Sequence, residues 1–232
     1  MKIKLLSTVI IASFVMFSIS CSNKTGAGSS STKDSAQVET SEQSATSSPK
    51  KYDIKSGIVS YVAEVMGMKT SQKLYFDDFG AKERQENITE IEMMGTKTRK
   101  VTVSLTKDGY KYEYDLENIT NKEDKVKKEI KKSKVYSGAS SDMSSMAASM
   151  TAEMKNKYEY KEEGTETVAG ITGNKFSMKM GKTKFTGVLY KKVMLKTVME
   201  IMTITAEKFE ENATVPEDKF ELPKDYTIIE VK

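Results

Sequence analysis

The sequence contains no histidine and no tryptophan, and it has only one cysteine and three prolines among its 232 residues. Without histidine, the chain lacks the commonest general base and the commonest protein ligand of transition metals. A single cysteine cannot form a disulfide within the chain, so stability has to come from core packing. No glycine-rich phosphate loop, nucleophile elbow or metal-ligand spacing occurs either. These absences predict a protein that is not an enzyme and that needs no cofactor or metal.

The net charge restricts the partners further. The whole chain carries a formal charge of +4, and residues 1–20 contribute two lysines, Lys2 and Lys4, and no acidic residue, so the remainder carries +4 − 2 = +2. A nearly neutral chain has no strongly basic domain that could release counterions from a phosphate backbone. We therefore expect no nucleic-acid partner.

The single cysteine, Cys21, stands between an apolar segment and a long polar tract. Residues 5–19 supply the apolar stretch after a short cationic start, and the small residues Ser18 and Ser20 precede the cysteine. The stretch is too short for a comfortable membrane span. It resembles a bacterial lipoprotein signal peptide, although Ser18 stands where leucine is usual. That resemblance implies cleavage before Cys21 and attachment of lipid there. The alternative is an ordinary secretory signal that is cut nearby and leaves a free thiol.

The chain divides into three parts by composition. Residues 1–20 form the expected signal, and Cys21 begins a segment that is rich in Ser, Thr, Gly, Ala and Lys up to residue 50. Such a segment buries too little apolar surface to offset its ordering entropy, so we expect a flexible tether. Residues 51–232 have a globular pattern and form one domain. The predicted location is the bacterial cell envelope, with a lipid anchor in the outer membrane and the domain facing the periplasm or the cell surface.

Alternating apolar residues predict mostly strands in this domain. The clearest hairpin runs through residues 101–116 around the turn Asp108-Gly109. Its register would place Leu105 opposite Tyr112, Val103 opposite Tyr114 and Val101 opposite Leu116. Further strands are expected at residues 57–66, 72–79, 175–180, 184–190 and 195–209. Many strands at short spacing favour a mainly β fold with a strongly curved antiparallel sheet.

One segment has helical periodicity instead. From Ser141 to Lys155, apolar residues recur at intervals of three and four, which predicts an amphipathic helix with Ser140 or Ser141 as its N-cap. A lone helix in such a domain usually packs on the concave face of the sheet. The apolar side of this helix carries Met143, Met146, Ala147, Met150, Thr151 and Met154.

Several short blocks resemble the DUF4412-type bacterial lipoproteins and the LolA/LolB lipoprotein-sorting superfamily. The resemblance rests on residues 75–80 (YFDDFG), on residues 170–180 with the strand at 185–190, and on the ending. That ending contains Thr205-Ala206, Asn212, Val215-Pro216, Phe220 and Leu222-Pro223. The resemblance implies an open half-barrel whose concave apolar surface is covered by helices. In LolA and LolB, this cavity receives the acyl chains of lipoproteins.

The methionine stripe is the candidate ligand site. Soft, flexible thioether side chains suit the lining of a cavity for lipid chains. Two other interpretations remain open: the helix fills the half-barrel with methionine as gap-filler, or the thioethers bind Cu(I). The residues predicted to line the cavity are Met143, Met146, Met150, Met154, Tyr112, Phe176 and Met178.

Other motifs have plainer interpretations. The alternation Tyr110, Tyr112, Tyr114 is typical of a buried sheet face, although it would also suit a sugar- or lipid-contacting platform. Neighbouring strand residues such as Asp77 and Asp78 point to opposite faces, so we expect turn residues rather than a carboxylate pair. The lysine-rich residues 122–134 also contain acidic residues, which favours a solvated strand or loop over a headgroup-binding patch.

The leading hypothesis is therefore a non-enzymatic envelope lipoprotein that binds or shields an apolar ligand, such as acyl chains, in its half-barrel. Its partners would be the membrane, through the N-terminal lipid, and a lipid or lipoprotein acyl chain. The alternative is a structural or protein-interaction lipoprotein whose cavity is filled by its own methionine-rich helix, with another envelope protein as its partner.

Overall fold

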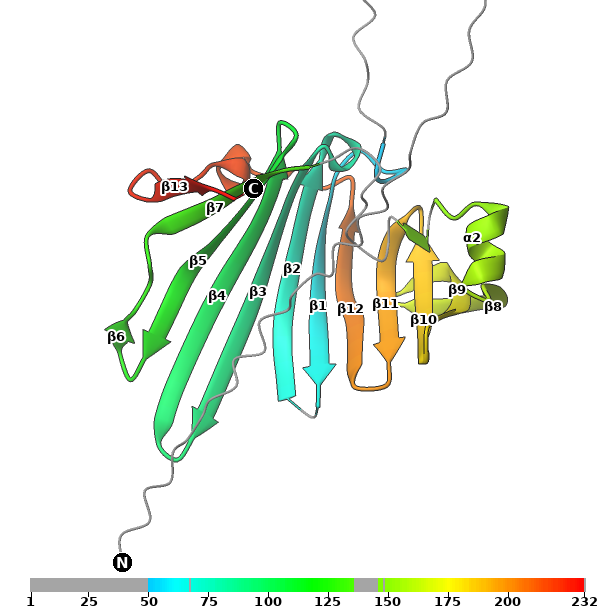
Figure 1. The fold of residues 1–232 in the computed structure, drawn as a ribbon, viewed down its shortest axis with the longest axis horizontal. Helices are drawn as coiled ribbons and strands as arrows, with labels where there is room; N and C mark the ends of the chain where they lie inside the picture. The colour runs from blue at the N-terminus through cyan, green and yellow to red at the C-terminus, as the bar shows by residue number, and fades with distance from the viewer. Residues whose placement is uncertain (1–49, 67, 136–145, 148, 232) are drawn as a thin grey trace, which may run out of the picture. The chain divides into compact units, whose positions relative to one another are not determined.

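The computed structural model describes residues 50–66, 68–135, 146–147 and 149–231. The predicted signal, Cys21, nearly all of the expected tether and Met143 lie outside the described residues. Thirteen strands form one large sheet in the order β13-β7-β5-β4-β3-β2-β1-β12-β11-β10-β9-β8, with β6 beside β5 (Figure 1). All strand pairs are antiparallel except the parallel pair of β13 with β7. The mainly β fold and the open, mostly antiparallel sheet confirm the predicted fold class.

The elements follow one another as mostly short-looped hairpins. The described part of the chain also contains the helix α2 and two 3₁₀ turns, at Asp78–Gly80 and Glu217–Phe220. The elements are β1 (Gly57–Val65), β2 (Met68–Asp77), β3 (Lys82–Met93), β4 (Thr96–Lys107), β5 (Tyr110–Thr120), β6 (Glu123–Asp124), β7 (Glu129–Lys134), α2 (Ala152–Lys157), β8 (Lys161–Val168), β9 (Ile171–Met180), β10 (Thr183–Tyr190), β11 (Val193–Met199), β12 (Met202–Glu211) and β13 (Thr227–Glu230).

The predicted hairpin of β4 and β5 is confirmed, except that one of its three predicted pairs is shifted by one residue. Leu105 pairs with Tyr112 and Val103 with Tyr114, as the alternation indicates. Val101, however, pairs with Glu117 instead of Leu116, because a bulge shifts the register between Val101 and Thr102. The extra residue lets Leu116 face solvent. Similar register shifts interrupt the pairs β1–β12, β8–β9 and β10–β11, and such bulges bend and twist the strands that carry them.

Two strand predictions need correction. The expected single strand over residues 195–209 is two strands, β11 and β12, which turn back at Glu200 and Ile201. That turn contains no glycine, proline, asparagine or aspartate. The sequence therefore has no turn signal between the two strands, and its pattern predicts one continuous strand. The strand expected over residues 72–79 is β2, which ends at Asp77, and a 3₁₀ turn begins at Asp78. Asp78 is therefore a turn residue as expected, whereas Asp77 is the last residue of the strand. The lysine-rich residues 122–134 contain the exposed β6 and part-exposed β7.

The predicted helix over residues 141–155 does not run unbroken. Thr151 has extended backbone angles, and its hydroxyl accepts a hydrogen bond from the Met154 N–H at 3.2 Å, so it caps a new helix. That helix, α2, buries none of its residues and lies beside β8 and β9 (Figure 1). A threonine that can cap the following turn competes with helix continuation. The segment before Thr151, rather than α2 itself, therefore packs on the sheet.

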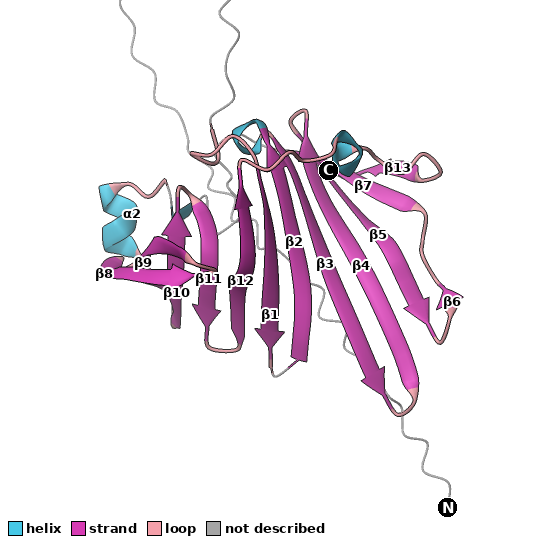
Figure 2. Ribbon diagram, turned by 180° about the vertical axis from the view of Figure 1, so that it is seen from behind, coloured by secondary structure: helices cyan, strands magenta, loops and turns pink. Residues whose placement is uncertain are grey.

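The sheet buries opposite faces in its two halves. One face carries the paired residues Ile58, Tyr75, Arg84, Leu105 and Tyr112 across β1 to β5. The segment after β12 runs across the upper ends of the strands on its way to β13 (Figure 2). The side chains of this segment that join the cluster around Tyr75 and Leu105 are Val215, Phe220, Leu222 and Tyr226.

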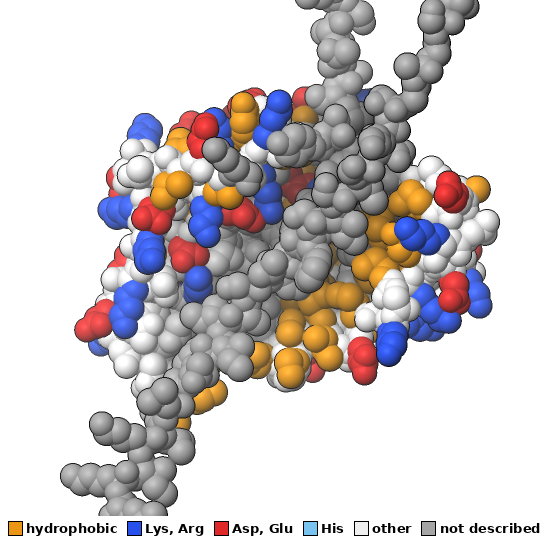
Figure 3. All heavy atoms as spheres, viewed as in Figure 1, with side chains coloured by type: hydrophobic (Ala, Val, Ile, Leu, Met, Phe, Trp, Pro, Cys, Tyr) orange, Lys and Arg blue, Asp and Glu red, His pale blue; other side chains and the backbone are white. Residues whose placement is uncertain are grey.

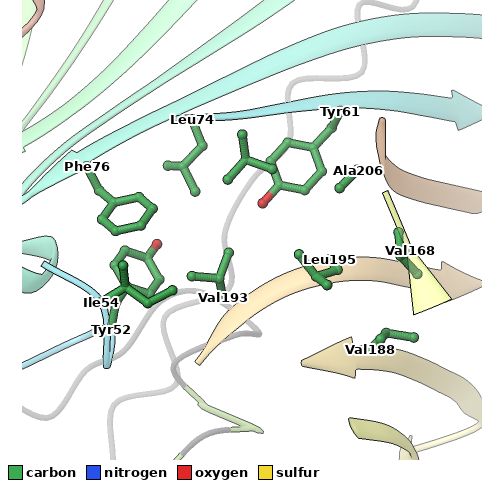
Figure 4. Close-up of a cluster of buried hydrophobic side chains, with 11 residues drawn as sticks. Tyr52, Ile54, Tyr61, Leu74, Phe76, Val168, Val188, Val193, Leu195 and Ala206 are labelled. Carbon is green, nitrogen blue, oxygen red and sulfur yellow. The ribbon is translucent and has the colours of Figure 1, made fainter. Parts of the chain in front are cut away.

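The other face of β1 and β2 is buried by the curl of the sheet itself. Tyr61, Leu74 and Phe76 point toward Val193 and Leu195 of β11, and Val168 of β8 reaches the same cluster (Figure 4). Four strands separate β8 from β1 in the sheet order, so this contact requires a strong curl. This face is therefore the concave one. The N-terminal residues Tyr52 and Ile54 close its upper end, and the Tyr52 ring lies 4.4 Å from that of Phe76.

A buried ion pair fastens the C-terminal segment to the convex face. Arg84 and Glu86 are both buried, with 2.7 Å between Arg84 Nε and Glu86 Oε1. Arg84 also donates to the Tyr114 hydroxyl and to the backbone carbonyl of Lys219. Burial raises the pKa of the Tyr114 phenol, while the Arg84 charge acts in the opposite direction. The charges are thus paired and hydrogen-bonded, as buried charges require.

We predict that Phe220→Ala destabilises the fold strongly. Phe220 is buried among the side chains of the convex cluster, and truncation of such a ring costs about 3–5 kcal/mol. Ile229→Ala, at an exposed position of β13, should change stability by less than about 0.5 kcal/mol. Urea unfolding followed by circular dichroism measures both. Equal, small losses would mean that the C-terminal segment does not contribute to the core.

Candidate functional site

The concave face ends in a row of apolar side chains across four strands. Val65 of β1 pairs with Met68 of β2 and with Met202 of β12, and Met202 also pairs with Met199 of β11. Directly paired residues on antiparallel strands point to the same face. Met68 is exposed and the other three are half-buried. We call Met68, Val65, Met202 and Met199 the methionine row.

Behind the row, the face becomes progressively more buried. The next pairs bring together Thr70, Ala63, Ile204 and Thr197. Further in, Tyr61 donates a hydrogen bond from its hydroxyl to the Met194 carbonyl at 3.0 Å. Burial raises the pKa of Tyr61, so the phenol stays neutral and its polar atom stays bonded. The methionine row is therefore the accessible margin of a dry, apolar surface, and hydrophobic side chains gather in this region of the molecule (Figure 3).

The segment before α2 meets this surface at its other margin. Met146, Ala147 and Met150 pack with Phe176 and Met178 of β9 in one cluster. Phe185 of β10 completes the buried part of that cluster, and Met194 and Met199 lie against it. Because Met199 belongs to both groups, the methionine row and this cluster form one continuous apolar surface.

The structure brings together only part of the predicted cavity set. Met146, Met150, Phe176 and Met178 share one cluster, and Met154 is half-buried in α2. Tyr112 belongs instead to the convex cluster with Leu105 and Tyr75. Its side chain and that of Leu74 lie on opposite faces of the sheet, as the pairing shows. Tyr112 therefore does not line the concave surface.

The sequence reasoning missed the methionine row. Met199 and Met202 flank the turn between β11 and β12, and Met66 and Met68 stand on either side of the break between β1 and β2. The recognisable signal was a pair of methionines around each turn. The pair Met199 and Met202 was not recognised because residues 195–209 were interpreted as one strand, and a continuous strand would not place these two residues opposite each other.

A second feature is a small pocket of about 200 Å³ over β8 to β11, in which three charged side chains stand beside Val188 and Val198. Glu166 lies between two lysines, 3.0 Å from Lys175 Nζ and 2.7 Å from Lys196 Nζ. Hydrogen bonds from Lys196, and then from Lys175, hold the pKa of the Glu166 carboxyl below its usual value. The three charges largely satisfy one another, so the pocket has the character of a structural ion-pair network.

The described part of the chain offers little other chemistry. Within it, no group of three or more acidic, cysteine or histidine side chains could hold a metal ion. No buried side-chain nitrogen or oxygen in these residues lacks a hydrogen-bond partner. Among the helices of the described ranges, none has the length and apolar character needed to cross a bilayer.

Comparisons with known proteins assign no family. No family model and no curated protein matches the chain, so the resemblance to DUF4412-type lipoproteins remains a prediction. An uncharacterized conserved protein from Thermus thermophilus is similar in structure, with a TM-score of 0.49, 9% identity, and coverage of 76% of this chain and 91% of that one.

Two further similar structures contain MucB. One is MucB, with a TM-score of 0.46, 13% identity and 78% of this chain covered. The other is the Pseudomonas aeruginosa MucA/MucB complex, with a TM-score of 0.42, 14% identity and 77% covered. The chain spans only 62% and 60% of the matched chains. With TM-scores below 0.5, these likenesses identify no ligand or partner for this protein.

We predict that the Glu166 network makes a pH-dependent contribution to stability. A lowered folded-state pKa contributes stability above the unfolded carboxyl pKa of about 4.3, and this stability is lost as the pH falls through the lower, folded value. Glu166→Gln should therefore lower stability by about 0.5–1 kcal/mol at neutral pH, with a difference that shrinks under acid conditions. Denaturant unfolding between neutral and acid pH measures it. Glu163→Gln, on the same strand and exposed, is the control, and an equal loss in both variants would contradict the assignment.

Proposed function

We propose that this protein is a membrane-anchored, non-enzymatic envelope lipoprotein that holds an apolar ligand, such as a lipid acyl chain, against its concave surface. The observation that carries this proposal is the methionine row, which continues without interruption into the cluster of Met146, Met150 and Phe176. A half-exposed apolar strip at the mouth of a dry concave face is the arrangement that an extended hydrocarbon chain would fit.

The dimensions and chemistry of the row support an acyl chain. Four strands at about 4.8 Å spacing carry the row over roughly 14 Å. Each methylene group that leaves water contributes about 0.8 kcal/mol. Methionine is unbranched and adapts to ligands of variable shape. Of its four residues, three are methionines, and only Val65 has a branched side chain.

A second candidate function is a structural or protein-interaction role. Met146, Ala147 and Met150 already pack closely on Phe176, Met178 and Phe185, as expected if the segment fills the surface. In that case the remaining exposed row would be part of a contact with another envelope protein. The two functions differ in what the segment does: it either lines the ligand site or covers it.

The proposal that the chain is not an enzyme rests on its side chains. The sequence has no histidine. Glu166 is the carboxylate that lines the pocket over β8 to β11, and it is paired with Lys175 and Lys196. Acid–base catalysis needs a group that can exchange a proton near the operating pH. The lowered pKa of Glu166 makes this carboxylate a poor candidate.

We predict that Met202→Lys lowers the affinity for a long-chain fatty acid by at least about tenfold, since it places a charge in the middle of the apolar row. Met94→Lys is the matched control, because Met94 is an exposed methionine outside the row, and it should leave fatty-acid binding unchanged. Titration with a fluorescent fatty acid, confirmed by native mass spectrometry, measures both. Absence of saturable binding in the folded parent protein would refute the lipid-ligand proposal.

The double variant Met146→Ser, Met150→Ser separates the two candidate functions. If these side chains line the ligand site, fatty-acid affinity falls. If they cover a filled surface, the variant takes up fatty acid that the parent protein does not. A folded parent protein and a folded variant that both fail to bind would leave the protein-interaction role, tested by cross-linking in the native envelope.

We predict for the anchor that Cys21→Ala removes the acyl mass from the N-terminal peptide and moves most of the chain from the washed membrane fraction to the soluble one. The reason is that stable attachment of a peripheral protein needs more than one acyl chain. Mass spectrometry of the peptide and fractionation of membranes measure the two effects. An N-terminal peptide of the parent protein that carries no acyl mass would contradict lipid anchoring at this residue.

A further inference from the structure

We propose that three hairpin tips at one end of the sheet form a bilayer-docking rim that acts independently of the lipid on Cys21. The tips connect β1 to β2, β3 to β4 and β11 to β12, and all three turns lie along the lower edge of the sheet in Figure 1. The rim residues are Met66, Met68, Met93, Met94 and Ile201.

The rim side chains project into solvent. Met94 is 99% exposed, Met66 76%, Met93 65%, Ile201 62% and Met68 53%. Two of the tips are joined, because the Met66 N–H donates to the Ile201 carbonyl at 3.0 Å. Single exposed apolar residues are ordinary on protein surfaces, but a set gathered at the tips of neighbouring hairpins marks an interaction site.

The opposite ends of the same strands are polar. The turn between β4 and β5 is Asp108-Gly109, that between β10 and β11 is Lys191-Lys192, and β2 is followed by Asp78. The contrast is clearest along β4, which follows the turn Met94-Gly95 and is followed by the turn Asp108-Gly109. The strands of the three rim hairpins therefore have an apolar end and a polar end.

The charge around the rim favours a lipid surface reached by apolar insertion. Exposed lysines close to the rim tips and on the adjacent β9–β10 hairpin are Lys69, Lys97, Lys182 and Lys184, and exposed acids near the tips are Glu64, Glu92 and Glu200. This near balance gives little electrostatic attraction, while long lysine side chains can still extend to headgroups as the tips enter the bilayer. Methionine and isoleucine at the apices supply the apolar contact.

The length of the chain outside the domain is compatible with docking on the membrane that holds the anchor. Residues 22–50 would link Cys21 to the domain, and a random coil of that length spans roughly 30 Å. Lys51 is bonded through its N–H to the Phe79 carbonyl, at the polar end of the strands of the rim hairpins. The ten residues of β2 cover about 30 Å, so the linker can reach back along the sheet. This last argument rests on the proposed anchor; the rim itself does not.

A tryptophan probe tests the rim directly, because the chain has no tryptophan of its own. Met94 and Asp108 are matched positions: each is exposed, has a positive φ (51° and 53°) and precedes a glycine in a two-residue turn. They stand beyond opposite ends of β4, whose twelve residues span about 37 Å. Met94→Trp and Asp108→Trp are introduced separately into the chain that starts at residue 21 and carries Cys21→Ala, so that no lipid of its own contributes.

Vesicles of phosphatidylcholine, alone or mixed with phosphatidylglycerol, are then added at low and high salt. We expect a blue shift of the Met94→Trp emission and its quenching by brominated lipid, on both vesicle types and in high salt, with neither effect for Asp108→Trp. Equal responses of the two probes, no response of either, or binding confined to anionic vesicles at low salt would each overturn the proposal.

A loss-of-function variant completes the test. Met66→Ser, Met94→Ser and Ile201→Ser together should lower vesicle co-sedimentation by at least about tenfold, with an unchanged melting temperature because these side chains are exposed. The same variant should keep its fatty-acid binding, since none of the three residues belongs to the methionine row. Failure of the rim and failure of the ligand proposal are thereby distinguishable.

Discussion

The fold depends on how a single open sheet hides apolar surface without a second layer of helices. β2 shows the constraint most directly, because Leu74, Tyr75 and Phe76 are consecutive and all buried. Consecutive strand residues point to opposite faces, so both faces of the sheet are covered at this strand. The C-terminal segment covers Tyr75, and the curl toward β8 and β11 covers Leu74 and Phe76. The two halves of the sheet bury opposite faces and meet at β1 and β2.

The concave face is the one that remains accessible. The C-terminal segment is fastened to the convex face by the Arg84–Glu86 pair and by Phe220, whereas the curl of the concave face leaves its lower margin open. The methionine row stands at this margin. Met68 belongs to both the row and the rim, and the other rim residues lie just beyond the row. Ligand binding and bilayer docking would thus use neighbouring parts of one apolar region, with the charged turns at the other end.

Much of this fold could be predicted from the sequence, because the two-residue period is a local property. The pairing of Leu105 with Tyr112 followed from it, and so did the mainly β class. The period cannot tell which face of a strand lies inside, and so Tyr112 was grouped with Phe176 although the sheet places them in different clusters. Turns without special residues, such as Glu200-Ile201, and caps inside a helical pattern, such as Thr151, also leave no distinct local signal.

The pairing of β1 with β12 affects the order in which the chain folds. Strands β1 to β5 and strands β8 to β12 each pair with their sequence neighbours, whereas β1 and β12 pair although all the other long strands lie between them in the sequence. Near this junction, the Ser56 hydroxyl donates to the Ala213 carbonyl, 157 positions away. Pairings of such separation form slowly because the loop-closure entropy is lost first. We expect two meanders to assemble early and to join at this strand pair last. Until they join, Tyr61 and Leu74 are not covered by Val193 and Leu195, and the chain is most prone to aggregate.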